Sequence, residues 1–408
     1  MYFQVHQPHR LVKFNVFDID TNKSYFDYER NRDICKRIAL NCYLPANEAL
    51  LRVIKESGNK FKVAFSISGT ALEQFEDFAP EVIDSFKKLA DTGCVEFLAE
   101  TYYHSLSYIF SKEEFKEQVV LHEKKIYELF GQKPVVFRNT ELVMNNEMAG
   151  FVEEMGYKGM LAEGADHLLG WRNPNFVYRT VSNGKSGVLL RNYKLSDDIA
   201  FRFSDEGWKE FPLTAEKYAG WIDGLKSNGE IVNIFMDYET FGEHHSPEKG
   251  IFDFLEKFPL KVIEDGNEFV TPGGAFDNCT AKGEVDMHDF VSWADNERDL
   301  SAWMGNPMQN NSLTEIFGME EAIKKSKDKE LLQDWRWLTI SDHFYYMSTK
   351  WFSDGAIHNI FNPFGSPYEA FVAYMNVLND IILRINKASG KVKISETPSV
   401  TVFRKGQK

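Results

Sequence analysis

Short apolar runs alternate with amphipathic segments from the start of the chain to residue 237. Runs rich in β-branched and aromatic residues are typical of buried strands, whereas apolar residues spaced three or four apart are typical of helices. The pattern predicts seven strands, at residues 2–6, 62–67, 93–98, 134–141, 158–163, 187–192 and 231–237. Because helical segments separate these strands, we expect them to pair in parallel through right-handed crossovers.

Capping and stop signals define the helices between the strands. Ser111-Lys-Glu-Glu114 is a capping box that opens a helix, and Gly131 ends it. Thr214 is an N-cap candidate for a later helix. The helices predicted in this way span residues 45–57, 80–90, 111–130, 146–155 and 214–226.

The pattern changes after residue 250, where helical signals replace strand signals. Ser312-Leu-Thr-Glu315 and Ser366-Pro-Tyr-Glu369 are both capping boxes, and residues 367–387 form the longest helical pattern. We therefore predict two units, an α/β unit over residues 1–250 and a C-terminal helical domain over residues 251–408.

Polar side chains at the ends of the predicted strands distinguish a closed barrel from an open sheet. They are His6, Ser68, Glu100, Glu141, Glu163, Arg191 and Asp237. The carboxyl ends of parallel strands lie at one edge of a sheet, but seven of them converge on one point only if the sheet closes. We therefore predict a seven-stranded (β/α)7 TIM-like barrel, rather than a doubly wound sheet, followed by the helical domain.

Composition narrows the classes of function. A chain of 408 residues with 43% hydrophobic content can bury a core large enough for an enzyme. Its formal charge of −14 and pI near 5.3 repel phosphate backbones, so we expect no nucleic-acid partner. No charged leader precedes the first strand and no run reaches the roughly 18 apolar residues of a membrane helix. We therefore expect a cytoplasmic protein with no membrane partner.

Residues 231–245 carry the densest set of reactive side chains. An apolar run delivers Asp237 and then breaks into a polar turn that contains Glu239, His244 and His245. Acids and histidines gathered behind a buried strand are typical of a functional loop, whereas a structural loop needs no such density. The segment therefore predicts chemistry at the carboxyl end of the last barrel strand.

Two carboxylates on separate strand ends, Glu141 and Asp237, suit the cleavage of a glycosidic bond. One acid must protonate the leaving oxygen, and one carboxylate must face the anomeric carbon. His6 and Gln7 at the end of the first strand suit the binding of sugar hydroxyls. Aromatic residues make up 14% of the chain and offer faces for sugar rings.

Four motifs follow one another along the chain: His6-Gln7-Pro8, Gly93-Cys-Val-Glu-Phe-Leu98, Phe137-Arg-Asn-Thr-Glu141, and Asp237-Tyr-Glu239 with Phe241-Gly242. In this order they resemble the motifs of glycoside hydrolase family 57, the family of α-amylases and 4-α-glucanotransferases. The present version looks closest to the α-amylase branch. The resemblance implies a seven-stranded barrel, a helical domain, and a retaining mechanism that acts on α-glucans such as starch and glycogen.

The resemblance also implies roles for single residues. Glu141 matches the nucleophile, Asp237 matches the general acid/base, and His6 matches a histidine that lines the sugar site. The remaining residues expected to bind substrate are Gln7, Glu100, His104, Glu239, His244, Trp293, Asp295 and Trp303. We expect no metal and no cofactor.

The two acids need opposite ionisation states. Asp237 must hold a proton at the working pH, and like-charge repulsion from Glu239 or Glu141 would raise its pKa. Glu141 must stay ionised, which Arg138 or a histidine would favour. Arg138-Asn-Thr before Glu141 and Tyr238 after Asp237 depart from the family pattern, where many members have Trp-Leu-x before the nucleophile and a small residue after the acid.

Residues 292–305 resemble the last motif of the family and combine Trp293, Asp295 and Trp303 with further charged residues. We expect this loop of the helical domain to close over the barrel mouth and one of its tryptophans to contact a glucose ring. The alternative is a packed helix between domains.

Three other functions are compatible with parts of this pattern. A 4-α-glucanotransferase would use the same residues on the same substrates. A metal-dependent polysaccharide deacetylase also uses a seven-stranded barrel, but it needs a His-x-x-x-His pair, and His6 and His9 are three apart. A glucan-binding module without turnover would not need both Glu141 and Asp237. The sequence leaves open the preferred chain length, the oligomeric state, and hydrolysis versus transfer.

Overall fold

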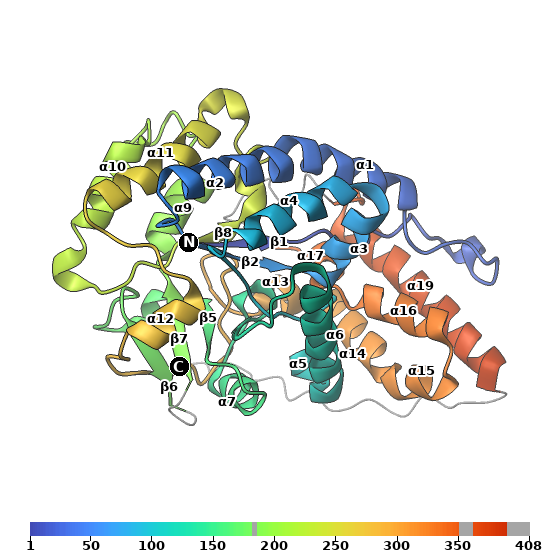
Figure 1. The fold of residues 1–408 in the computed structure, drawn as a ribbon. Coiled ribbons are helices and arrows are strands. Elements are labelled where there is room, and N and C mark those ends of the chain that lie inside the picture. Colours follow the sequence, from blue (N-terminus) through green and yellow to red (C-terminus); the bar gives the residue numbers. More distant parts are fainter. Residues whose placement is uncertain (182–185, 351–361, 390–408) are drawn as a thin grey trace.

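The computed structural model describes residues 1–181, 186–350 and 362–389 (Figure 1). The seven predicted strands are present as β1 (Tyr2–Val5), β2 (Val63–Ile67), β3 (Val95–Phe97), β4 (Val136–Arg138), β5 (Gly159–Glu163), β7 (Gly187–Arg191) and β8 (Phe235–Asp237). Two further strands were missed. The first, β6 (Val177–Thr180), pairs antiparallel with β7, and β9 (Glu284–Val285) pairs parallel with β6.

The seven barrel strands pair in parallel in two groups. One group has the order β3-β2-β1-β8, and the other begins β4-β5-β7. Ala99, just beyond β3, joins the groups: its N–H donates to the Val136 carbonyl at 3.0 Å, and the Arg138 N–H donates to the Ala99 carbonyl at 2.8 Å. The strands therefore follow one another in the order β8-β1-β2-β3-β4-β5-β7.

The junction between β7 and β8 differs from the others. No strand ladder connects these two strands in the described residues. Instead, the Asn192 N–H donates to the Asn233 carbonyl at 2.8 Å, and Arg191 Nε donates to the Phe235 carbonyl at 2.8 Å. The predicted parallel α/β fold is confirmed, and the junction between β7 and β8 rests on single hydrogen bonds.

The side chains inside the ring of strands form two layers. The lower layer is apolar and takes one residue from each strand or its continuation: Tyr2, Ala64, Leu98, Val136, Leu161, Leu189 and Phe235. Two positions further along, where the alternation of a strand returns to the same face, the residues are Gln4, Ser66, Glu100, Arg138, Glu163, Arg191 and Asp237. The apolar layer therefore lies beneath a polar layer. In the polar layer, acidic and basic side chains alternate from Glu100 to Asp237.

Helices cover the outside of the strands. They are α1 (Tyr28–Ile38), α2 (Leu44–Glu56), α3 (Gly69–Phe78), α4 (Pro80–Asp91), α5 (Ser107–Phe110), α6 (Lys112–Phe130), α7 (Asn146–Glu154), α8 (Asp166–Leu169), α9 (Tyr193–Ala200), α10 (Ala215–Asp223) and α11 (Ile251–Glu264). A further helix, α12 (Pro272–Asn278), instead packs Ala275 against the apolar layer inside the strands. Outward-facing Phe3 and Phe65 form a second core with Leu50 of α2 and Leu255 of α11. Within the described ranges, no helix is both long and apolar enough to cross a membrane.

The predicted helix boundaries agree with the observed ones where a cap marks them. Ser111 Oγ accepts the Glu114 N–H at 3.1 Å at the start of α6, and Gly131 follows the helix with a left-handed φ of 67°. Thr214 Oγ1 accepts the Lys217 N–H at 3.2 Å at the start of α10. Helix α1 was missed because its sequence is mostly charged and buries few residues.

The C-terminal region is helical, as predicted, over its described residues. It contains α13 (Ser301–Met304), α14 (Pro307–Gly318), α15 (Glu320–Ser326), α16 (Lys329–Leu338), α17 (Ser341–Tyr345) and α19 (Pro367–Ser389). Ser366 caps α19 by accepting the Glu369 N–H at 3.2 Å, as expected. The predicted cap at Ser312 is wrong, because Ser312 is buried inside α14. Asn306 is the actual cap and accepts the Gln309 N–H at 3.0 Å.

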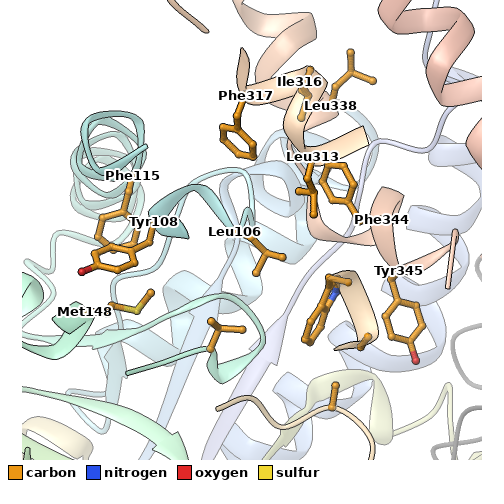
Figure 2. Packing of buried hydrophobic residues seen from close by; sticks show 14 of the residues in the cluster. Leu106, Tyr108, Phe115, Met148, Leu313, Ile316, Phe317, Leu338, Phe344 and Tyr345 are labelled. Atoms are coloured by element: carbon orange, nitrogen blue, oxygen red, sulfur yellow. The ribbon is translucent and has the colours of Figure 1, made fainter. Parts of the chain in front are cut away.

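One continuous core joins the C-terminal helices to the barrel helices (Figure 2). Phe115 and Tyr108, from α6 and α5, belong to the same cluster as Leu313 and Phe344 of the C-terminal region. Helix α11 packs against α2 and α10 on the outer face of the barrel. The boundary at residue 250 stays a prediction, since it follows a change in sequence pattern and no break in this core marks it.

Candidate active site

A cavity lies at the carboxyl ends of the strands and gathers most of the predicted site residues. Those that line it are His6, Gln7, His104, Glu141, Asp237, Glu239, His244, Trp293 and Trp303. The polar layer of the barrel forms the bottom of this cavity, because Gln4, Arg191 and Asp237 also line the cavity. Residues that are far apart in the sequence therefore meet in one site.

Glu141 has a strained backbone. Its φ of 57° and ψ of 23° lie in the left-handed region, and Leu142 follows with a φ of 51°. Such a conformation costs a non-glycine residue about 1–3 kcal/mol and persists only where surrounding contacts impose it. The backbone N–H of Trp293 donates to the backbone carbonyl of Glu141 at 3.1 Å and holds the turn that follows β4. The turn directs the Glu141 side chain into the cavity.

The Glu141 carboxylate has a donor on each oxygen. Trp293 Nε1 donates to Oε2 at 2.6 Å, and His104 Nε2 lies 3.4 Å from Oε1. Burial would raise the pKa of Glu141, but the hydrogen bond and charge of His104, together with Arg138 and Trp293, hold it below its usual value. Glu141 is therefore ionised at neutral pH, as predicted for a nucleophile.

His104 lies between two carboxylates. Its Nδ1 is 2.8 Å from Glu100 Oε2, and its Nε2 faces Glu141. A carboxylate only accepts, so both ring nitrogens carry a proton and the ring is an imidazolium. Burial opposes this charge, but the bonds to Glu100 and Glu141 raise the pKa of His104 to about 9.

Glu100 lies behind His104, away from the cavity wall. It is fully buried, and its Oε1 accepts from Ser66 Oγ at 2.7 Å and from Gln4 Nε2 at 3.1 Å. Burial would raise the pKa of Glu100, but His104 lowers it to about 2. We expected Glu100 to bind substrate. In the free protein it is fully buried and positions His104, and its contact with substrate stays a prediction.

The raised pKa of His104 predicts a pH dependence of stability. A histidine whose pKa rises from 6.5 unfolded to about 9 folded gives stability that is full below pH 6.5 and is lost as the pH rises through 9. Scanning calorimetry between these values should show a steeper fall of Tm for the native protein than for His104→Gln. His288→Gln, at an exposed site, should keep the native profile. Parallel profiles for native protein and His104→Gln would show that His104 carries no extra proton.

His6 stacks on His104, with ring centroids 4.0 Å apart and an interplanar angle of 19°. Its Nε2 is 2.9 Å from Asp342 Oδ2, and its Nδ1 is 2.7 Å from Ser68 Oγ. Burial and the neighbouring His104 charge lower the pKa of His6, against the attraction of Asp342. The neutral ring therefore donates from Nε2 to Asp342 and accepts at Nδ1, so both nitrogens are already used within the protein.

Asp342 of α17 is a site residue that sequence reasoning missed. It lines the cavity and holds His6, although 336 positions separate the two in the chain. Arg10, Tyr345 and Tyr346 also line the cavity and were missed. The sequence signal that could have located Asp342 and the two tyrosines is a charged residue followed by several aromatic residues at 342–346.

Asp237 ends β8, and Glu239 lies in the single 3-10 turn that follows. The Tyr43 hydroxyl donates to Glu239 Oε1, and Gln7 Nε2 donates to the same oxygen at 3.4 Å. Burial and the charge of Asp237 raise the pKa of Glu239 to about 8. At neutral pH Glu239 therefore carries a proton in the free protein. Which oxygen holds it with substrate bound stays a prediction.

The segment that begins at Ser292 forms one wall of the cavity. Trp293 is half-buried and bound to Glu141, and Trp303 is only 1% exposed. Trp303 Nε1 has no hydrogen-bond partner among the described residues. Asp295 does not face the cavity: it is buried and lies 3.7 Å from Lys350. Contact of either tryptophan with a glucose ring stays a prediction, and a direct contact of Asp295 with substrate is not favoured by this geometry.

No group of three or more His, Cys, Asp or Glu side chains in the part of the chain that the structure describes is arranged to hold a metal ion. Two histidines of the cavity each bond to one carboxylate: His104 to the buried Glu100 behind it, and His6 to Asp342.

Known proteins resemble this chain in sequence and in fold. Residues 1–288 match the model of glycosyl hydrolase family 57. A protein of Methanocaldococcus jannaschii that carries a provisional alpha-amylase name is 42% identical over 406 residues, which cover 95% of this chain and 85% of the relative. A branching enzyme of the same family from Pyrococcus horikoshii aligns with a TM-score of 0.66 and 14% identity over 97% of each chain. An alpha-amylase of Thermotoga maritima aligns with a TM-score of 0.61 and 12% identity, over 96% of this chain and 93% of the other.

Proposed function

Because the chain belongs to glycosyl hydrolase family 57, we propose that it hydrolyses α-1,4-glucosidic bonds in starch- and glycogen-type α-glucans by double displacement. Glu141 is the nucleophile and Asp237 the general acid/base in this proposal. The relative from Methanocaldococcus jannaschii, whose name refers to an alpha-amylase, supports the substrate class.

The observation that carries the proposal is the state of Glu141. Its strained turn presents a carboxylate to a cavity that also contains Asp237, and two donors, His104 and Trp293, keep it ionised. A nucleophile must be charged and fixed in direction before substrate arrives, because ordering it during the reaction would add to the barrier. A carboxylate with a structural role would not need to face a cavity with a second acid opposite.

In the first step, Asp237 donates its proton to the glycosidic oxygen while Glu141 attacks the anomeric carbon. The departing oxygen leaves as a free hydroxyl, and the sugar becomes an ester of Glu141. As the charge of Glu141 disappears, the imidazolium of His104 still faces the carboxylate of Glu100, so the buried charges remain balanced. In the second step, Asp237 removes a proton from water, which attacks the anomeric carbon and frees Glu141.

Retention of anomeric configuration requires the two carboxyl groups to lie about 5–5.5 Å apart, whereas inversion needs roughly 6.5–9.5 Å. Asp237 extends from β8, and Glu141 follows β4, across the ring of strands. A separation near 5 Å in a complex with substrate is therefore an expectation of this proposal.

Hydrolysis and glucan transfer share the first step and differ in whether water or a sugar hydroxyl takes the glycosyl group. A time course on maltoheptaose separates them. We expect only products shorter than the substrate, with the new reducing ends appearing first as α-anomers in proton NMR spectra. Products longer than maltoheptaose would establish transfer as the activity, and new ends appearing first as β-anomers would overturn the double displacement.

A further inference from the structure

The indole of Trp293 lies against two guanidinium groups while its N–H binds Glu141. Arg138 Cζ is 4.8 Å from the centroid of the Trp293 ring, and Arg191 Cζ is 5.7 Å from it. Trp293 Nε1 donates to Glu141 Oε2 at 2.6 Å. Arg138 itself precedes Glu141 by three positions, at the end of β4. Arg138 and Glu141 are therefore connected in two ways, along the chain and through the indole of Trp293.

The two arginines are held in different ways. Arg191 is fully engaged: it donates to the Phe235 carbonyl at 2.8 Å and to Glu163 at 3.2 Å, and it also bonds to Asp197. Arg138 is fully buried, and its Nε, Nη1 and Nη2 have no hydrogen-bond partner among the described residues. A buried cation without partners is costly, so what faces it matters.

What faces Arg138 is the π-system of Trp293 and the charge of two carboxylates. The indole face attracts a cation, and this attraction is strongest away from water. The charge of Arg138 also acts on Glu100 and Glu141 and favours the ionised form of both. The contact with the ring therefore compensates the buried charge at the point where the ring binds Glu141.

We propose that Arg138 is a positioning residue for Glu141 that acts through the face of the Trp293 indole. The proposal rests on the proposed role of Glu141 as nucleophile. A cation over the ring draws electron density from the indole, and the N–H becomes a stronger donor to the carboxylate. The same contact fixes the plane of the ring, so the N–H keeps its direction toward Glu141 Oε2.

This arrangement sets the pH below which Glu141 becomes protonated and inactive. The acid limb is the low-pH side of the profile of kcat/KM against pH. Loss of the Arg138 charge should therefore move the acid limb to higher pH. The other charged or titratable groups around the same cavity are His6, Arg10, His104, Arg191, Asp237, Glu239, His244 and Asp342. Each of them keeps its own side chain in a variant at Arg138, and the indole signal of Trp293, which binds Glu141 directly, assigns a shift of the acid limb to Glu141.

Arg138→Met tests the proposal because it keeps an unbranched buried side chain and removes the charge. We expect the acid limb of kcat/KM on maltoheptaose to rise by about 0.5–1 pH unit, in keeping with the strength of one cation–π contact. The eight tryptophans give separate indole N–H signals after labelling with nitrogen-15, and Trp293→Phe assigns the signal of Trp293. That signal should titrate with Glu141, and its midpoint should rise in Arg138→Met even where activity is not measured.

A double-mutant cycle tests the route through the indole. Trp293→Phe keeps an aromatic face for Arg138 but removes the N–H, so it should raise the acid limb by itself. Arg138→Met should shift the acid limb by clearly less in the Trp293→Phe background than in the native protein, because only its direct charge on Glu141 is then left to lose. Full additivity of the two shifts would overturn the proposal and leave Arg138 as a direct charge on Glu141. Arg138→Lys, which restores the charge, should return part of the shift and serves as the second variant if Arg138→Met does not fold.

Arg172→Met is the matched control, because Arg172 Cζ lies 4.9 Å from the ring centroid of Trp171 on the exposed surface. It should move only the Trp171 signal and leave the acid limb unchanged. A lower Tm in Arg138→Met with an unmoved acid limb and an unmoved Trp293 midpoint would also overturn the proposal. If instead the Trp293 midpoint moves while Glu141→Gln keeps its activity, the contact is confirmed and the proposed role of Glu141 is wrong.

Discussion

Glu141→Gln should lower the rate of α-glucan hydrolysis by about 10⁴-fold or more, because removal of a nucleophile leaves only binding and transition-state contacts. The amide has nearly the same shape but cannot form the glycosyl ester. Its single carbonyl oxygen still accepts from Trp293 Nε1 and holds the side chain in place, while the contact of His104 with the second oxygen is lost. Release of reducing ends from starch measures the loss, and isothermal titration with maltooligosaccharides should give a Kd within a few-fold of the native value.

Glu147→Gln is the control for this change, since Glu147 is an exposed glutamate of α7 that pairs with Lys112 at the surface. It should keep native activity. Retained hydrolysis in Glu141→Gln would remove Glu141 from the chemistry, and Glu239 would become the next candidate because it lines the same cavity. A loss of both turnover and binding, with a lowered Tm, would instead indicate that the strained turn after β4 requires the carboxylate to fold.

The sequence was sufficient to predict those parts of the site that lie at the ends of strands. Alternation with a period of two puts the residues at positions 4, 66, 138 and 237 on the inner face, directly above the apolar layer. Asp237 follows directly from that alternation, whereas Glu141 lies three residues beyond Arg138 and follows from the break after its apolar run. The strand order also followed, because parallel strands joined by helices leave few arrangements.

The contacts that set the chemistry of these residues could not be predicted in the same way. Trp293 lies 152 positions from Glu141, and Asp342 lies 336 positions from His6. No local pattern encodes pairs at such separations, because they depend on how the C-terminal helices pack over the barrel. Glu100 shows the same limit: its place after a strand could be predicted from the sequence, but its burial and its hydrogen bonds from Gln4 and Ser66 could not.

A capping-box pattern also gave a wrong prediction, because the start and the interior of a helix can show the same residue spacing. Ser312 and Glu315 have the spacing of a capping box, but they lie inside α14, where positions three apart share a face of the helix for a different reason. Asn306 and Gln309 form the real box. A capping pattern therefore predicts a helix start only where the residues before it cannot be helical.

Asp237→Asn should nearly abolish hydrolysis of starch but leave appreciable reaction with α-maltosyl fluoride, because fluoride departs without a proton. The first step then proceeds through Glu141, and the glycosyl ester accumulates since no base activates water. Added azide should release the sugar as the α-azide, because a small anion needs no general base and attacks the face that water would have attacked. Fluoride release and the anomeric signal of the azide product measure the two steps separately.

Asp223→Asn, on the exposed face of α10, is the control and should hydrolyse starch at the native rate without any effect of azide. The anomer of the azide product distinguishes the two acids. A β-azide from Asp237→Asn would mean that azide replaced the nucleophile, so Asp237 would be the nucleophile and the proposed roles would be reversed. In a third outcome, neither variant at 141 and 237 reacts with the fluoride, whereas Glu239→Gln is rescued by azide to the α-product. The general acid/base would then be Glu239, whose pKa the neighbouring charge of Asp237 helps to raise in the free enzyme.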